Sequence, residues 1–133
     1  MEEYAPSFVF PRVNKMVKCV VECTYYTHVL VRLLETDGLP TLGVQAVINR
    51  EDCMFGIKDE HRLSDLFSPG DTVIARVLSL GHTGHVVLST ADPAHGVIKA
   101  VEYSTLREIR LQSGAFRGSD GKPLPRKTAQ GGE

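Results

Sequence analysis

Residues 67–81 read FSPGDTVIARVLSLG and contain the clearest strand signal in the chain. From residue 72 to residue 80, valine or alanine alternates with larger or charged side chains, and a period of two is typical of a half-buried strand. A turn at Pro69-Gly70 precedes this strand. The segment HVVLST at 85–90 follows a glycine-containing loop and is predicted to pair back as a hairpin.

The same alternation predicts three strands upstream, at residues 16–24, 28–35 and 44–50. Between the third and fourth strands, Leu63, Leu66 and Phe67 have the spacing of one short helical face, so residues 62–67 are predicted to be a helix. Downstream, residues 97–101 are expected to add a short strand. Residues 106–111 are ambiguous between strand and helix.

Five or six strands with one short helix predict an all-β fold, and a five-stranded antiparallel OB-fold barrel is the leading candidate. One face of such a barrel, centred on strands two and three, binds oligonucleotides through stacking side chains and phosphate contacts. The predicted organisation is an N-terminal extension at 1–15, the barrel at 16–112 and a flexible basic tail at 113–133.

Composition places the chain among globular proteins with one core. It has 133 residues, 42% of them hydrophobic and 23% charged. We expect no membrane span and no signal peptide, because apolar runs are short and Met1 is followed by two glutamates. The 3 cysteines form no disulfide framework, which favours a reducing compartment.

The total charge of -1 is unevenly distributed along the sequence. Residues 113–133 carry a net charge of +2, so residues 1–112 carry -3. Proteins that bind nucleic acid mainly by neutralising phosphates are distinctly basic. We therefore expect any nucleic-acid contact to be local and weak, or shared with a partner.

No catalytic or metal site can be assembled from the sequence. Cys19 and Cys23 are roughly 13 Å apart on an extended strand, too far for one zinc ion, and are predicted to be core residues. Cys53 follows two acidic residues, which raise the pKa of a thiol. Three histidines near residues 82–95, the GHTG string at 81–84 and a stretch of acids at 52–65 are interpreted as loop and surface residues.

Four segments together resemble a known family. They are FSPGDTVIARVLSLG at 67–81, VVLSTAD at 86–92, HGVIKA at 95–100 and QAVINRED at 45–52. The sequence from about residue 16 to residue 101 resembles the CSL-type cap subunit of the eukaryotic RNA exosome. In that family, this segment is the RNA-binding barrel named after ribosomal protein S-one, a variant of the OB-fold.

The resemblance implies a non-catalytic subunit that docks on the ring of RNase-PH-like proteins and lines the entry to the RNA pore. Its implied partners are those ring subunits and, weakly, single-stranded RNA. No membrane, small-molecule substrate, metal or other cofactor is implied. The implied locations are the nucleus, nucleolus and cytoplasm.

Three features depart from the family pattern. The family has a further N-terminal domain, whereas about a dozen residues precede this barrel, so the chain is interpreted as a possible fragment. A zinc ribbon follows the barrel in archaeal members, but no cysteine follows Cys53 here. Leu30 and Asn49 stand where such barrels usually place an aromatic residue and a histidine, which removes the expected stacking platform.

The candidate RNA-binding residues are basic or polar side chains on the first four predicted strands: Lys18, His28, Arg32, Asn49, Arg50 and Arg76. Leu30, Ile74 and Leu78 are expected to form an apolar and basic docking patch with Arg32 and Arg76. The alternative function is a free-standing OB-fold protein that binds single-stranded RNA. An enzyme is a third possibility, for which no catalytic constellation is found.

Overall fold

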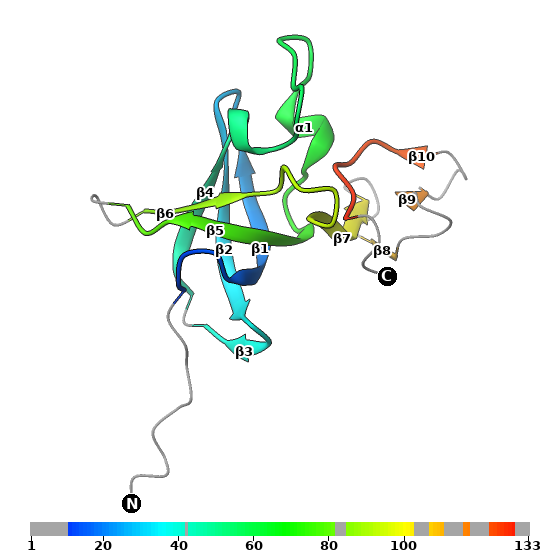
Figure 1. The fold of residues 1–133 in the computed structure, drawn as a ribbon. Coiled ribbons are helices and arrows are strands. Elements are labelled where there is room, and N and C mark those ends of the chain that lie inside the picture. The colour runs from blue at the N-terminus through cyan, green and yellow to red at the C-terminus, as the bar shows by residue number, and fades with distance from the viewer. Residues whose placement is uncertain are drawn as a thin grey trace, which may run out of the picture.

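A computed structural model describes residues 11–41, 43–81, 85–102, 107–110, 116–117 and 123–129. Its elements form one curved sheet with loops gathered at both ends, and a second, two-stranded sheet (Figure 1). No helix in these ranges is long and apolar enough to cross a membrane.

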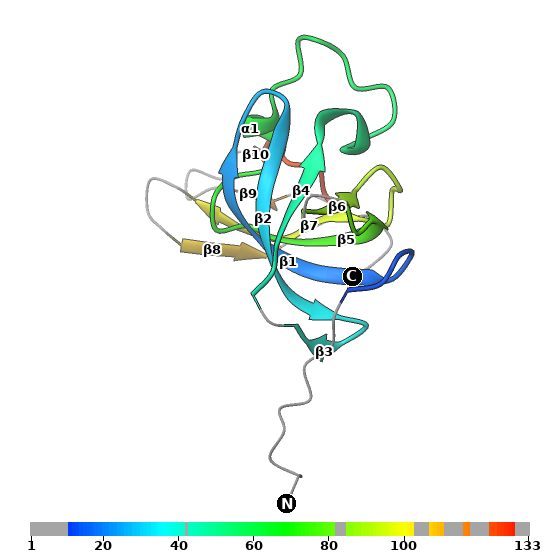
Figure 2. The same ribbon diagram turned by 90° about the vertical axis from the view of Figure 1, so that its left-hand side faces the viewer.

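Five strands close into the predicted OB-fold barrel. They are β1 (Met16–Thr24), β2 (His28–Thr36), β4 (Gln45–Asn49), β5 (Thr72–Ser79) and β6 (Val86–Ser89). Their spatial order is β1-β2-β4-β6-β5, and β5 pairs with β1 to complete the closure (Figures 1 and 2). β4 and β6 pair in parallel, whereas the other pairs around the barrel are antiparallel.

The remaining elements extend or cover this barrel. The expected strand at 97–101 is confirmed as β7 (Gly96–Glu102), which pairs with β5, and the ambiguous segment contains β8 (Arg107–Arg110). The predicted helix is α1 (Leu63–Leu66). The sequence did not indicate a short 3-10 helix, η2 (Arg50–Asp52), or three two-residue strands: β3 (Leu39–Pro40), β9 (Phe116–Arg117) and β10 (Pro123–Leu124).

The core lies inside the barrel and follows the period-two pattern. On β5, Val73, Ala75 and Val77 are fully buried. Alternate residues of β1 and β2 belong to the same cluster: Val17, Cys19, Val21, Val29, Val31 and Leu33. Leu63 of α1 and the following Phe67 pack against this cluster, with 1% and 0% of their surface exposed. The helix therefore contributes apolar side chains to the barrel core.

A bulge near the end of β1 changes the expected face of one residue. The pairing register of β1 and β2 shifts between Val21 and Cys23, because Val21 pairs with Val31 and Cys23 pairs with Leu30. An extra residue on one strand moves the following side chains to the other face. The prediction that Cys23 is a core residue is therefore wrong, since its side chain is exposed, whereas Cys19 is fully buried.

Residues 125–129, which we name the C-terminal strap, pack along β7 and beside α1. The Lys127 amide donates to the Leu66 carbonyl at 3.0 Å, and the Val97 amide donates to the Lys127 carbonyl at 2.7 Å. Gly96 has φ +141°, and a Cβ there would overlap the Lys127 carbonyl. Within the region predicted to be a flexible tail, the strap and the buried Phe116 are thus packed.

A buried ion pair fastens this strap to the barrel. Arg126 Nε donates to an Asp71 carboxylate oxygen at 2.6 Å, and the two side chains are 7% and 0% exposed. The amides of Ser68 and Val101 donate to the same carboxylate at 3.1 Å and 2.9 Å. Asp71 of the Pro-Gly-Asp turn therefore connects the start of β5, the end of β7 and the strap.

This arrangement predicts a large loss of stability when the arginine alone is removed. Arg126→Met leaves the Asp71 carboxylate buried without its cation, so the free energy of unfolding should fall by about 3 to 5 kcal/mol in a denaturant titration. Adding Asp71→Asn to that variant should restore part of the loss, because the buried charge is then gone.

The control is Arg62→Met. Arg62 pairs with Asp65 at 3.5 Å, but these side chains are 75% and 49% exposed. Its loss should change stability by no more than about 0.5 kcal/mol. Equal effects of Arg126→Met and Arg62→Met would contradict the role of the buried pair.

Candidate nucleic-acid interface

Three of the six predicted RNA-binding residues, Lys18, Arg32 and Arg76, lie on the side of the barrel strands that faces away from the core, which we name the outer face. Each of them contacts another side chain. Lys18 on β1 pairs with Glu35 at 3.7 Å. Arg32 on β2 contacts Glu22 through Nε and a terminal nitrogen, at 2.9 Å and 2.8 Å. A terminal nitrogen of Arg76 on β5 donates to the Asn14 side chain at 2.8 Å. The carboxylates of Glu35 and Glu22 reduce the positive charge that the outer face offers to phosphates, whereas the neutral Asn14 leaves that of Arg76 unchanged.

The expected docking patch is more spread out than its sequence pattern suggested. Arg32 pairs with Val20 of β1, and Arg76 pairs with Met16 of the same strand. Val20 and Met16 are separated by roughly 13 Å along an extended strand, so the two arginines share a face without forming one cluster. The three apolar residues expected between them are all half-buried: Leu30, Ile74 and Leu78.

The other three predicted residues lie together where β2 begins and β4 ends. His28 pairs directly with Asn49, and the Arg50 amide donates to the Thr27 carbonyl at 2.8 Å. The turn between β1 and β2 adds Tyr25 and Tyr26, which are 51% and 59% exposed. We name Tyr25, Tyr26, His28 and Arg50 the aromatic end of the barrel.

Two ring contacts organise this end. The Tyr25 and His28 rings stack with centroids 4.8 Å apart and an angle of 29° between their planes. The Arg50 guanidinium carbon lies 4.4 Å from the centroid of the Tyr26 ring, a cation–π contact. A side-chain hydrogen bond with Cys23 raises the pKa of Tyr25, so this ring stays neutral at physiological pH.

Arg50 also holds the loop that follows η2. One of its terminal nitrogens donates to the carbonyls of Lys58 and His61, at 2.5 Å and 2.7 Å. The other donates to the Tyr26 carbonyl at 3.4 Å. Most donors of this guanidinium are therefore used inside the protein, and its stacked position fixes the Tyr26 ring.

A cavity of about 210 Å³ adjoins the aromatic end. Tyr25 and Tyr26 line one part of it, and Arg62, Leu63 and Ser64 at the start of α1 line another. The Arg62 side chain is 75% exposed. A flat aromatic ligand that carries negative charge would find both stacking surface and a cation here.

Leu30 on β2 and Asn49 on β4 occupy the strand positions where an aromatic residue and a histidine are usual, as the sequence indicated. The exposed rings lie instead in the turn just before β2, which strand periodicity does not indicate. The signal was present as two adjacent tyrosines in a turn, where exposed aromatic side chains have no packing role.

The buried thiols and histidines show ordinary structural roles. Burial raises the pKa of Cys19 and of Cys53 to about 12, and nearby Asp52 adds to the effect at Cys53. His95 is 6% exposed, and its Nε2 lies 3.0 Å from the Met16 sulfur. Of the other histidines considered as ligands, His85 is exposed, and residue 82 lies outside the described ranges, as does most of the GHTG string.

The closed five-strand barrel and its short helix define the chain as an OB-fold protein. No family model matches the sequence. The chain is 30% identical over 107 residues to "Exosome complex component CSL4" of Homo sapiens, an alignment that covers 79% of this chain and 55% of that protein. The Mus musculus protein of the same name is 31% identical over the same length and coverage. Over this matched length the chain is similar to exosome component CSL4, and the predicted resemblance is confirmed.

The matched relatives are longer than this chain, and one solved structure shares its fold. The chain spans about half the length of the curated relatives it matches. The crystal structure of a candidate exosome complex RNA-binding protein superposes with a TM-score of 0.55 at 16% identity. That alignment covers 72% of this chain and 52% of the other, and it supports the fold.

The contacts of Arg50 predict that it stabilises the protein more than Arg32 of the outer face does. Arg50→Met removes charged hydrogen bonds to two loop carbonyls, so the free energy of unfolding should fall by about 1 to 3 kcal/mol. Arg32→Met removes an exposed pair and should cost less than about 1 kcal/mol. Urea titrations of both variants measure the difference, and a reversed order would contradict this assignment.

Proposed function

We propose that this chain acts as a non-catalytic cap subunit of an RNA exosome. In this role it docks on the RNase-PH-like ring and helps to guide RNA into the pore for 3'-5' processing and decay. The similarity over 107 residues to exosome component CSL4 carries this proposal. The corresponding locations are the nucleus, nucleolus and cytoplasm.

The aromatic end supports a direct contact with single-stranded RNA. Unpaired bases stack on aromatic side chains regardless of sequence, and each such contact contributes about 1 to 3 kcal/mol. Tyr25 and Tyr26 offer exposed rings, and Arg62 stands beside the adjoining cavity. The six residues predicted from sequence remain proposed RNA contacts, with His28, Asn49 and Arg50 at this end and Lys18, Arg32 and Arg76 on the outer face.

Charge argues that this RNA contact is weak in the isolated chain. Residues 1–112 carry a net charge of -3, and Glu35 and Glu22 already pair with two of the proposed cations. Little counterion release is therefore available to drive binding. Weak binding suits a subunit that passes RNA along to a pore, because tight binding would retain it.

The chemistry of the buried side chains supports a role without catalysis. The raised pKa values of Cys19 and Cys53 keep both thiols protonated, and a protonated thiol is a poor nucleophile. We propose no cofactor and no metal for the function of this chain.

A free-standing RNA-binding protein is the second candidate. It is favoured by one observation, that Tyr25 and Tyr26 offer exposed rings beside a cavity that Arg62 also lines. Co-purification from a cell extract separates the two. Ring subunits at an equal ratio support the cap subunit, and their absence supports the free-standing protein.

The first prediction from this proposal concerns RNA affinity. We expect the isolated chain to bind single-stranded RNA with a Kd between about 1 and 100 µM at physiological salt. Tyr25→Ala combined with Tyr26→Ala should weaken binding by about tenfold, because the stacking surface is lost. Fluorescence anisotropy with a labelled oligonucleotide measures both.

Phe55→Ser is the matched control, since Phe55 is an exposed aromatic residue that does not line the cavity beside the aromatic end. It should leave RNA affinity unchanged. Nanomolar binding, or equal losses in the tyrosine variant and the control, would count against this RNA contact.

The second prediction concerns docking. Arg32→Glu together with Arg76→Glu should abolish assembly with purified RNase-PH-like ring subunits, because it reverses the charge of a proposed interface. The thermal midpoint of the free chain should barely move, since surface substitutions usually change stability by about 0.5 kcal/mol or less.

Size-exclusion chromatography measures this assembly, with Arg62→Glu as a charge-reversed control outside the outer face. If the double variant folds and still assembles at wild-type affinity, the docking surface lies elsewhere. If it unfolds, the two arginines are structural.

A further inference from the structure

Phe55 is the most exposed large apolar side chain among the described residues, at 75%. It lies in the loop between η2 and α1, and the next residue, Gly56, has a positive φ of 71°. Exposing a phenylalanine to water is unfavourable, and neither the core nor the aromatic end uses this ring. Its exposure therefore calls for a different partner.

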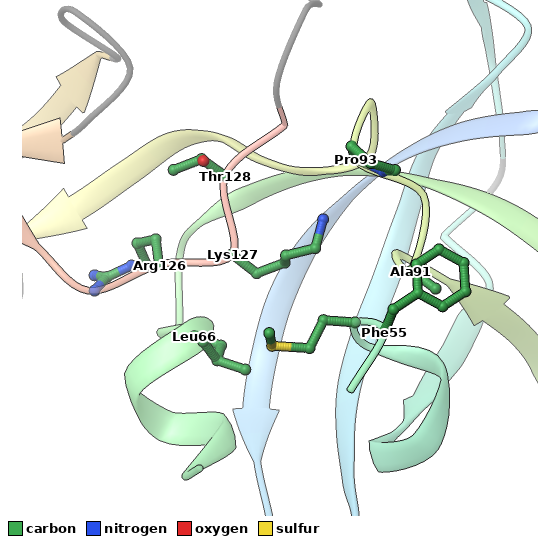
Figure 3. Close-up of a pocket in the computed structure, with 8 residues that line it drawn as sticks. Phe55, Leu66, Ala91, Pro93, Arg126, Lys127 and Thr128 are labelled. Carbon is green, nitrogen blue, oxygen red and sulfur yellow. The ribbon is translucent and has the colours of Figure 1, made fainter. Parts of the chain in front are cut away.

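A groove with a volume of about 340 Å³ lies beside this ring. Phe55 and Ala91 line one side, Leu66 of α1 lines the other, and strap residues 126–128 complete the wall (Figure 3). Met54 and Pro93 add further apolar surface. A groove of this size and composition accommodates one or two apolar side chains of a ligand.

The cations that line this groove are already satisfied inside the protein. Arg126 is buried in its ion pair with Asp71. Lys127 Nζ donates to the His95 carbonyl at 2.6 Å and to the Asp92 carbonyl at 3.2 Å. Burial lowers the pKa of Lys127, and its two carbonyl partners occupy two of the three donors of this ammonium.

The carboxylates near this groove have neutral partners: Asp92 accepts from the Ala94 amide at 2.8 Å, and Asp52 has a hydrogen bond with Asn49. Asp92 lies between Ala91 and Pro93 of the lining, and Glu51 and Asp52 shortly precede Met54. None of these three carboxylates forms an ion pair within the ranges that the structure describes. Residues 51–65 as a whole carry five acidic and two basic side chains. The Thr90 amide donates to the Asp52 carbonyl at 3.0 Å, which places this acidic segment next to Ala91 of the lining. The lining is therefore largely apolar, and its neighbours Asp52 and Asp92 are acidic.

We propose that this groove, which we name the Phe55 groove, binds an extended segment of a partner protein in which an apolar side chain is flanked by lysine or arginine. The apolar side chain fills the space between Phe55 and Leu66, and the basic residues face the carboxylates of Glu51, Asp52 and Asp92. This pattern matches the common division of interfaces into an apolar centre and a charged rim.

The charge distribution favours a protein ligand over RNA at this position. Phosphates would meet unpaired carboxylates around the Phe55 groove, whereas a basic peptide would be attracted to them. The Phe55 groove also shares no lining residue with the cavity at the aromatic end. Binding at the Phe55 groove is therefore independent of the proposed RNA contact.

Selection from a random-peptide phage library against the full chain tests this inference. We expect enrichment of sequences with a large apolar residue flanked by lysine or arginine. A synthetic peptide of the strongest sequence should lose about tenfold or more in affinity against Phe55→Ser, because a central apolar anchor is removed. Leu39→Ser is the matched control, since Leu39 is 50% exposed on β3 and does not line the groove, and it should bind as wild type.

A charge variant tests the rim separately. Glu51→Gln with Asp92→Asn keeps the shape of both side chains, and the Asp92 side-chain oxygen that accepts from the Ala94 amide at 2.8 Å is retained. Salt should weaken peptide binding to the wild type and affect this variant less. No enrichment, enrichment of acidic peptides, or binding unaffected by Phe55→Ser would overturn the inference. Loss of RNA affinity in Phe55→Ser would show a nucleic-acid surface instead.

Discussion

The buried carboxylate of Asp71 is the constraint on which much of this structure depends. A charge that has no contact with water must find all its partners within the protein, and Asp71 finds them on three separate segments. The Pro-Gly turn, the end of β7 and the C-terminal strap are therefore held in one arrangement. This arrangement also holds both walls of the Phe55 groove in place, because Leu66 shortly precedes the turn and residues 126–128 belong to the strap.

The barrel was predictable from sequence because its strands follow a simple physical rule. A half-buried strand alternates its faces, and β1, β2 and β5 show this alternation almost throughout. The exceptions need information from distant residues. Nothing local indicates that β1 bulges before Cys23, because the bulge arises from its pairing with β2. Likewise, a glycine- and proline-rich tail gives no sign that Arg126 will meet a carboxylate 55 residues away.

The candidate sites were less predictable than the fold, for a related reason. Side chains that bind ligands at loop ends do not repeat with the strand period, so the pattern that locates β2 overlooks Tyr25 and Tyr26 in the turn before it. Arg50 was predicted to contact RNA, but its sequence position gave no hint that it would hold the carbonyls of its own loop. Phe55 lies in a loop, so neither strand nor helix periodicity indicates a role for it.

The strap also affects when the barrel reaches its full stability during synthesis, because Arg126 is made after the barrel strands. Asp71 leaves the ribosome before Arg126, and the sequence separation of 55 residues takes roughly 3 to 10 s to translate. A barrel that closes in this interval contains a buried carboxylate without its cation, so the nascent domain is less stable than the finished one. The barrel therefore gains stability in two steps, first when its strands close and again when Arg126 reaches Asp71.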